Sequence, residues 1–207
     1  MDYSPSSENP ASPRRYKQVA RAQAAESTRG RILDAFADAL RSGWMDDVTL
    51  DGVAATAGTT RQTVIRMFGG KEGLLRAVAE RFAGEVAGRR SVPEQAGPAA
   101  CVRALVQDYE VIGDSILRLL AQEGRYPVLS ALLDVGRSGH EGWVASVFAP
   151  ALDRRTGSER DAVLAQLVVA TDVYAWKLLR RDRGLSASDT ERLITSMVTK
   201  LAREDKQ

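Results

Sequence analysis

The twenty residues TLDGVAATAGTTRQTVIRMF, which begin at Thr49, restrict the fold of this chain more than any other segment. Thr49 can cap a helix, and Gly58 is the residue type that ends a helix in the left-handed conformation. Thr59 or Thr60 can then cap a second short helix, whose inward face begins at Val64. Two short helices joined by a glycine turn predict a helix-turn-helix unit.

A helix-turn-helix unit reads DNA with the outer face of its second helix. Arg61 can pair with guanine and Gln62 with adenine, each through two hydrogen bonds. Hydroxyl groups at a helix start, and the backbone N–H groups that begin the helix at Lys71, suit phosphate oxygens. An ordinary solvated helix face is the alternative interpretation. The predicted DNA-binding residues are Thr49, Thr59, Thr60, Arg61, Gln62, Thr63, Arg66 and Lys71.

Helical periodicity continues on both sides of this segment. Apolar residues at that spacing predict five further helices, at about 26–42, 71–88, 105–120, 163–178 and 193–201. The residues from Ser188 to Glu191 form a capping box that we expect to begin the last helix. No stretch alternates like a strand. The predicted fold class is therefore all-α, with an N-terminal three-helix helix-turn-helix DNA-binding domain followed by a second helical domain.

Prolines and composition predict where the chain divides. The head of the chain is rich in Pro and Ser, and Pro93 and Pro98 fall in the linker-like stretch SVPEQAGP. We predict a disordered N-terminal arm over 1–22, the DNA-binding domain over 23–92 and the C-terminal domain over 98–207. The arm contains Arg14, Arg15, Lys17 and Arg21, which could reach a DNA minor groove or form a solvated tail.

Charge and composition exclude several classes of function. The formal net charge is only +2, but residues 14–71 carry ten Lys/Arg against six Asp/Glu, which weakly favours an anionic partner. One cysteine, Cys101, excludes an intrachain disulfide and a cysteine-based zinc site. No nucleophile elbow, phosphate loop or convincing carboxylate pair is present. We expect no enzyme activity, no cofactor and no metal.

The same sequence gives no sign of a membrane or secreted protein. Residues 1–13 lack the apolar core of a signal peptide, and the longest apolar runs, such as Val163 to Ala170, are too short to span a bilayer. We therefore expect a cytoplasmic protein without a membrane partner.

The stretch VTLDGVAATAGTTRQTVIRMFGGKEGLL resembles the signature of the tetracycline-repressor (TetR) family of bacterial regulators. The preceding helix, RGRILDAFADALRSGWMDDV, also fits, so the resemblance covers roughly 26–75. One position departs from the family pattern. The family usually has a tyrosine, which commonly touches a phosphate, where this chain has Ile65. Ile65 cannot donate a hydrogen bond, so Arg66 or Thr60 supplies that contact or binding is weaker there.

The resemblance also implies what the rest of the chain does. It implies a repressor that binds a near-palindromic operator as a homodimer through its last two helices and is released by a small-molecule effector. The long apolar stripes of those helices support dimerisation independently. We expect Asp172 to form a hydrogen bond in the dimer interface. The predicted effector-binding residues are Tyr109, Arg118, Gln122, His140 and Trp143.

Two other classes of function stay open at this point. A DNA-processing enzyme could use the helix-turn-helix as an anchor, but it would need a catalytic domain after residue 98, and the sequence shows none. A helical interaction module that has lost DNA binding is the other alternative, and Ile65 is its only support.

Overall fold

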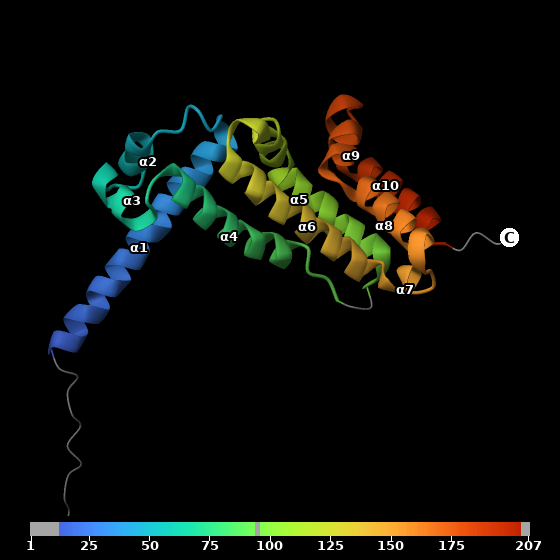
Figure 1. Cartoon of the computed structure of the whole chain (residues 1–207), viewed down its shortest axis with the longest axis horizontal. Coiled ribbons are helices and arrows are strands. Elements are labelled where there is room, and N and C mark those ends of the chain that lie inside the picture. Colours follow the sequence, from blue (N-terminus) through green and yellow to red (C-terminus); the bar gives the residue numbers. More distant parts are fainter. Residues whose placement is uncertain (1–12, 94–95, 204–207) are drawn as a thin grey trace, which may run out of the picture.

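The computed structural model describes residues 13–93 and 96–203, and every regular element in these ranges is a helix. The all-α prediction is therefore confirmed. The N-terminal part contains α1 (Pro13–Ser42), α2 (Leu50–Thr56), α3 (Arg61–Phe68) and α4 (Lys71–Arg89). The C-terminal part contains α5 (Gly97–Leu120), η2 (Glu123–Arg125), α6 (Pro127–Val147), α7 (Ala149–Leu152), α8 (Gly157–Thr171), α9 (Val173–Lys177), η3 (Leu178–Asp182) and α10 (Ala187–Ala202). Figure 1 shows an elongated molecule with α2 and α3 at one end, α8 to α10 at the other, and α5 and α6 between them.

Helix α1 begins much earlier than the sequence pattern predicts. The apolar stripe indicated a start near residue 26 and a disordered arm over 1–22, whereas the helix starts at Pro13. The segment that follows is rich in Ala, Arg and Gln, which favour helix without needing a packing partner. Residues 17–27 are exposed, and Figure 1 shows this half of α1 projecting beyond the body. Residues 1–12 lie outside the described ranges.

The segment predicted as one helix through 163–178 is two helices. The chain breaks at Asp172, whose side chain caps α9 by accepting a hydrogen bond from the N–H of Tyr174 at 2.8 Å. Within the described residues, no single helix is long and apolar enough to cross a membrane; α8 with α9 and η3 passes that test only as a pair bent by 40°.

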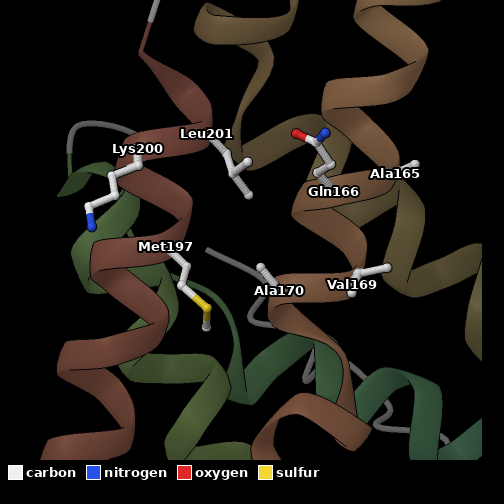
Figure 2. Close-up of a pocket in the computed structure, with 7 residues that line it drawn as sticks. All are labelled: Ala165, Gln166, Val169, Ala170, Met197, Lys200 and Leu201. Carbon is white, nitrogen blue, oxygen red and sulfur yellow. The ribbon is translucent and has the colours of Figure 1, made fainter.

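The last helix starts two residues before the predicted capping box. Ser186, rather than Ser188, is its N-cap, and its side chain accepts from the N–H of Asp189 at 3.0 Å. Helices α8 and α10 then pack side by side and leave a shallow groove between them (Figure 2). The residues that line the groove are mostly apolar.

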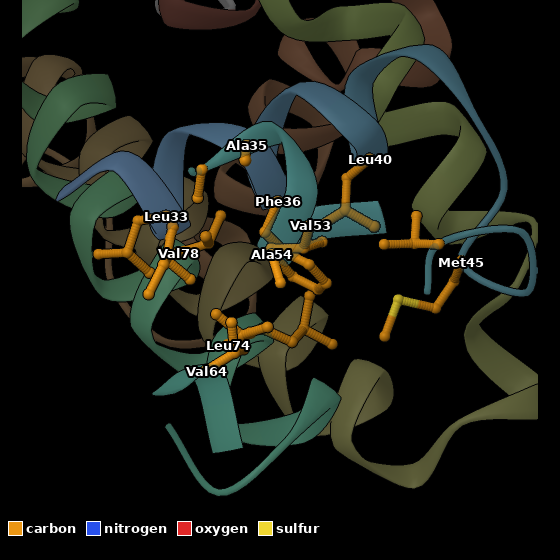
Figure 3. Packing of buried hydrophobic residues seen from close by; sticks show 14 of the residues in the cluster. Leu33, Ala35, Phe36, Leu40, Met45, Val53, Ala54, Val64, Leu74 and Val78 are labelled. Atoms are coloured by element: carbon orange, nitrogen blue, oxygen red, sulfur yellow. The ribbon is translucent and has the colours of Figure 1, made fainter. Parts of the chain in front are cut away.

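The N-terminal core is built from one face of each helix in that part. Phe36 of α1, Val53 of α2, Val64 of α3 and Leu74 of α4 are buried against one another (Figure 3). Leu129 of α6 is also fully buried in this cluster. The first turns of α6 therefore complete the core on which α2 and α3 rest.

Glycines set the angle between α3 and α4. Gly69 ends α3 in the left-handed conformation, with φ of 77°. A Cβ atom on Gly73 would lie 1.6 Å from the carbonyl oxygen of Phe68. Any other residue at this position would therefore force the first turn of α4 away from the end of α3.

Candidate nucleic-acid interface

The helix-turn-helix unit has the local geometry that its sequence predicts. Thr49 caps α2, and its Oγ1 accepts from the N–H of Gly52 at 3.0 Å. Gly58 has a φ of 63°, and the N–H of Thr59 donates to the carbonyl of Ala54 at 2.9 Å, which closes the end of α2. Thr60 then caps α3. These bonds fix the entry and exit of both short helices, so the outer face of α3 is held in one orientation.

The outer face of α3 is formed by four exposed side chains, those of Arg61, Gln62, Ile65 and Arg66. Arg61 forms an ion pair with Asp51 of α2, with 3.2 Å between Nη1 and Oδ2. Ile65 is 42% exposed. The face therefore combines a guanidinium, an amide and an apolar group that are all open to a partner.

The predicted hydroxyl residues lie together at the start of α3. The Oγ1 atoms of Thr60 and Thr63 are 3.0 Å apart, and the N–H of Thr63 donates to Thr60 Oγ1 at 3.2 Å. Thr49 and Thr60 are exposed, and Thr59 and Thr63 are half-buried. These side chains stabilise the helix starts and still present oxygen atoms at the surface.

The side chain of Lys71 reaches a partner outside the helix-turn-helix. Its Nζ donates to the carbonyl oxygen of Met45 at 2.9 Å, across the gap between α4 and the loop after α1. The side chain therefore stabilises that loop. The backbone N–H groups of the first turn of α4 are separate from this contact.

Two arginines of α1 that the sequence reasoning missed hold the helix-turn-helix in place. Arg31 Nε donates to the carbonyl of Ala57 at 3.0 Å, at the end of α2. The guanidinium of Arg29 lies over the ring of Phe68, 4.6 Å from its centroid, at the end of α3. Both residues were counted in the basic segment 14–71, but nothing local in the sequence indicates these contacts.

Three of the five predicted effector residues lie together. His140 stacks on Trp143, with ring centroids 5.8 Å apart. The guanidinium of Arg90 lies 5.0 Å from the ring centroid of Tyr109 and 5.6 Å from that of Trp143. His140 Nε2 lies 3.2 Å from Thr171 Oγ1. We call Arg90, Tyr109, His140, Trp143 and Thr171 the aromatic cluster.

The other two predicted effector residues, Arg118 and Gln122, lie elsewhere, at the contact between the two parts of the chain. The side chain of Gln122 is fully buried, and its Oε1 accepts from the N–H of Met45 at 2.8 Å. Arg118 donates to the carbonyl oxygen of Arg41. Tyr109 lies within α5 and Gln122 just beyond its end, so the two side chains lie in different places, which the sequence pattern could not separate.

The sequence reasoning also missed a buried ion-pair group at the end of α4. The Asp108 side chain is fully buried; its Oδ1 lies 2.6 Å from Arg89 Nε and its Oδ2 lies 2.7 Å from Arg90 Nε. A carboxylate within the apolar stripe of the predicted 105–120 helix was the available signal. The group joins the aromatic cluster, through Arg90, to the helix that follows α3.

Comparison with known proteins agrees with this geometry. The model of the family "bacterial regulatory proteins, tetR family" matches residues 32–78. No curated protein matches the chain. A tetR-family transcriptional regulator from Streptomyces coelicolor has a similar structure, with a TM-score of 0.64, 21% identity and coverage of 84% of this chain and 80% of that one.

Two further solved structures share the fold. A SmeT–triclosan complex has a TM-score of 0.66 and 16% identity, and the match covers 86% of this chain and 93% of that one. A second TetR-family regulator from Streptomyces coelicolor has a TM-score of 0.51 and 18% identity, with coverage of 86% and 96%. Residues 32–78 therefore match the helix-turn-helix domain of the TetR family of transcriptional regulators, and the chain as a whole shares the fold of these solved structures.

The aromatic cluster predicts that stability depends on pH. Burial, and after it the positive charge of Arg90, lower the pKa of His140 from 6.5 to about 4. The neutral ring accepts at Nδ1 from Arg90 Nη1, 3.4 Å away, and the carboxylate of Asp172 opposes the shift only in part. The unfolded chain binds this proton more tightly than the folded chain does. The contribution of His140 to the free energy of unfolding is therefore fully present above pH 6.5 and is lost as the pH falls towards 4.

His140 is the only histidine of the chain, so this effect can be isolated. We expect the free energy of unfolding to fall by about 2 kcal/mol between pH 7 and pH 5, measured by urea titration. In the His140→Gln variant most of this decrease should be absent. An equal decrease in both proteins would contradict the assignment to His140.

Proposed function

We propose that this chain is a cytoplasmic repressor that binds a near-palindromic operator as a homodimer and leaves it when a small molecule binds. In this proposal residues 23–92 form the DNA-binding domain and residues 98–207 bind the effector and dimerise. The observation that carries the proposal is the outer face of α3, where Arg61, Gln62 and Arg66 are exposed on a helix-turn-helix with closed caps.

Gln62 and Arg66 are the side chains that we assign to base edges. Both are exposed on α3, and an amide matches adenine while a guanidinium matches guanine. Arg61 is also available, because an exposed ion pair such as that with Asp51 contributes only about 0–1 kcal/mol and can be exchanged for a contact with DNA. Thr49, Thr59, Thr60 and Thr63 would contact phosphate oxygens, as would the backbone at Lys71.

Base and phosphate contacts predict different effects on binding. Gln62→Ala and Arg66→Ala should each relax the preference at one base pair, at a cost of about 1–3 kcal/mol for the preferred base. Thr59→Ala should weaken all sequences alike. Binding selections from random duplexes, followed by affinity titrations, measure both effects. If Thr59→Ala changes the preferred base, or neither of the first two variants does, the assignment is wrong.

Lys71→Ala tests whether the Lys71 side chain acts through the protein or on the DNA. Its side chain donates to the Met45 carbonyl, so the substitution should lower thermal stability as well as affinity. If it lowers the salt dependence of binding without a loss of stability, the side chain contacts phosphate instead.

The homodimer proposal rests on the apolar face that α8 and α10 share. Val169 of α8 is 69% exposed and Met197 of α10 is 38% exposed, and both line the groove in Figure 2. Only Gln166 and Lys200 bring polar groups to this lining. A continuous apolar face of this kind is stable in water when a second copy covers it, which makes a four-helix bundle. A two-fold dimer would present α3 twice, to related half-sites.

A charge in this face should separate the protomers. We expect Val169→Asp to shift the chain from dimer to monomer at micromolar concentration, as measured by sedimentation velocity, and to weaken operator binding by more than tenfold. Val135→Asp is the matched control, because Val135 of α6 is 65% exposed on another part of the surface. A wild-type monomer that still binds DNA tightly would contradict the dimer.

We assign the effector to the aromatic cluster. It combines aromatic rings with a few polar groups, which are the residue types that line small-molecule sites. A solved structure of the same fold is a complex with triclosan, which supports a small organic effector for this chain as well. Arg90 follows the last residue of α4, so a ligand that moves Arg90 would move the helix that begins directly after α3.

An effector must bind the form that cannot hold DNA more tightly than the form that can. Ligands that raise the melting temperature should therefore release the operator, with a coupling of about 1–3 kcal/mol in titrations with both ligands. Trp143→Ala and His140→Ala should weaken such ligands, whereas Trp44→Phe, in the loop after α1, should not. Tight ligands that leave operator affinity unchanged would overturn the switch.

A further inference from the structure

The exposed half of α1, residues 17–27, lacks a partner within the described chain. It extends for roughly 16 Å at the usual rise of an α-helix. Lys17 and Arg21 are exposed, and neither has an ion-pair partner among the described residues. The sequence from 13 to 25 contains four Lys/Arg and no Asp or Glu. A helix of this charge, held away from the body, is suited to an anionic partner.

The direction of this basic face follows from the contacts of the next turns of α1. Arg31 reaches the end of α2, and Arg29 lies over Phe68 at the end of α3, so these two side chains lie on either side of the helix-turn-helix. At 3.6 residues per turn, Arg21 projects between the directions of Arg29 and Arg31. Lys17, one turn earlier, shares that side. Both cations therefore face the side of α1 on which α2 and α3 lie.

The chemistry of this face distinguishes between two anionic partners. A membrane-bound helix needs a row of large apolar side chains opposite its cations. The apolar residues of 17–25 are only Val19 and alanines. Duplex DNA needs only cations at the right side and distance. Figure 1 shows α1 continuing past α3 and away from the C-terminal part.

We propose that Lys17 and Arg21 bind phosphates of the DNA that flanks the half-site read by α3. The proposal rests on the function proposed above and adds a second contact region to it. A continuous helix is too wide for a minor groove of about 6 Å, so the contact is with the backbone and not with the groove floor. It should strengthen binding without adding base preference.

The test uses the full chain and duplexes recovered by binding selection from random-sequence DNA. Each duplex is made in two forms, one with about ten extra base pairs on each side and one trimmed to the half-sites. The variant Lys17→Ala/Arg21→Ala is compared with the wild type and with Gln18→Ala/Gln23→Ala, which alters neutral residues of the same helix. Alanine favours helix, so both variants should keep α1 intact, which circular dichroism checks.

The salt dependence of affinity is the deciding measurement. A dimer that loses two cations per protomer should lose a slope of roughly 3–4 in log K against log salt on the flanked duplex. The neutral variant should match the wild type, and on the trimmed duplex all three proteins should agree. An unchanged slope on the flanked duplex overturns the proposal, as does an equal loss on the trimmed one.

Two further outcomes separate this proposal from its alternatives. If the wild type cosediments with anionic phosphatidylserine vesicles while Lys17→Ala/Arg21→Ala does not, and the DNA affinity of that variant is unchanged, the helix binds a membrane and the proposal is wrong. Selection of no duplex by the wild type would instead overturn the function proposed above. If Gln62→Ala/Arg66→Ala no longer selects a duplex but Lys17→Ala/Arg21→Ala binds like the wild type, the proposed function stands and the flanking contact is wrong.

Discussion

The position of α4 depends on the carboxylate of Asp108, which water does not reach. Its two oxygens accept from Arg89 and Arg90. One acidic group of α5 therefore holds the end of α4, the helix that directly follows α3. Removing one partner of a buried ion pair typically costs about 3–5 kcal/mol, because the remaining charges are left without compensation. The same contact places Arg90 against Tyr109 and Trp143, so the fastening of α4 and the aromatic cluster are one structure.

A second connection joins the two parts at the loop after α1. The backbone N–H of Met45 donates to Gln122 of the C-terminal part, and its carbonyl accepts from Lys71 of α4. Nearby, Arg125 forms an ion pair with Asp46. The DNA-binding part is thus held at the end of α4 and at this loop.

The sequence predicted the features that depend on neighbouring residues better than those that depend on tertiary contacts. Thr49, Gly58 and Thr60 act on backbone atoms within a few residues, so their caps could be inferred without tertiary structure. The start of α1 was missed because its first turns are helical by propensity and show no apolar stripe to count. The break at Asp172 was missed because its carboxylate, inside an apolar stripe, was assigned to a hydrogen bond in the dimer interface and not to an N-cap.

The long-range contacts could not be predicted from one sequence. Arg118 of α5 and Gln122, just beyond the end of α5, follow Tyr109 in the sequence, and only the packing shows that they face Arg41 and Met45 instead of the aromatic cluster. The contact of Lys71 with the Met45 carbonyl was not predicted, because that carbonyl lies on another element. The buried pairing of Asp108 with two consecutive arginines requires the angle between α4 and α5, which no local pattern encodes.

The short joint between α3 and α4 has a consequence for the rate of any switch. Only Gly69 and Gly70 separate the two helices, and Gly73 lies against the carbonyl of Phe68, so no loop can absorb a movement between them. When α4 turns, α3 must turn with it as one body. Reorientation of α3 is then a rigid-body motion, which takes microseconds to milliseconds. It does not require local unfolding and refolding.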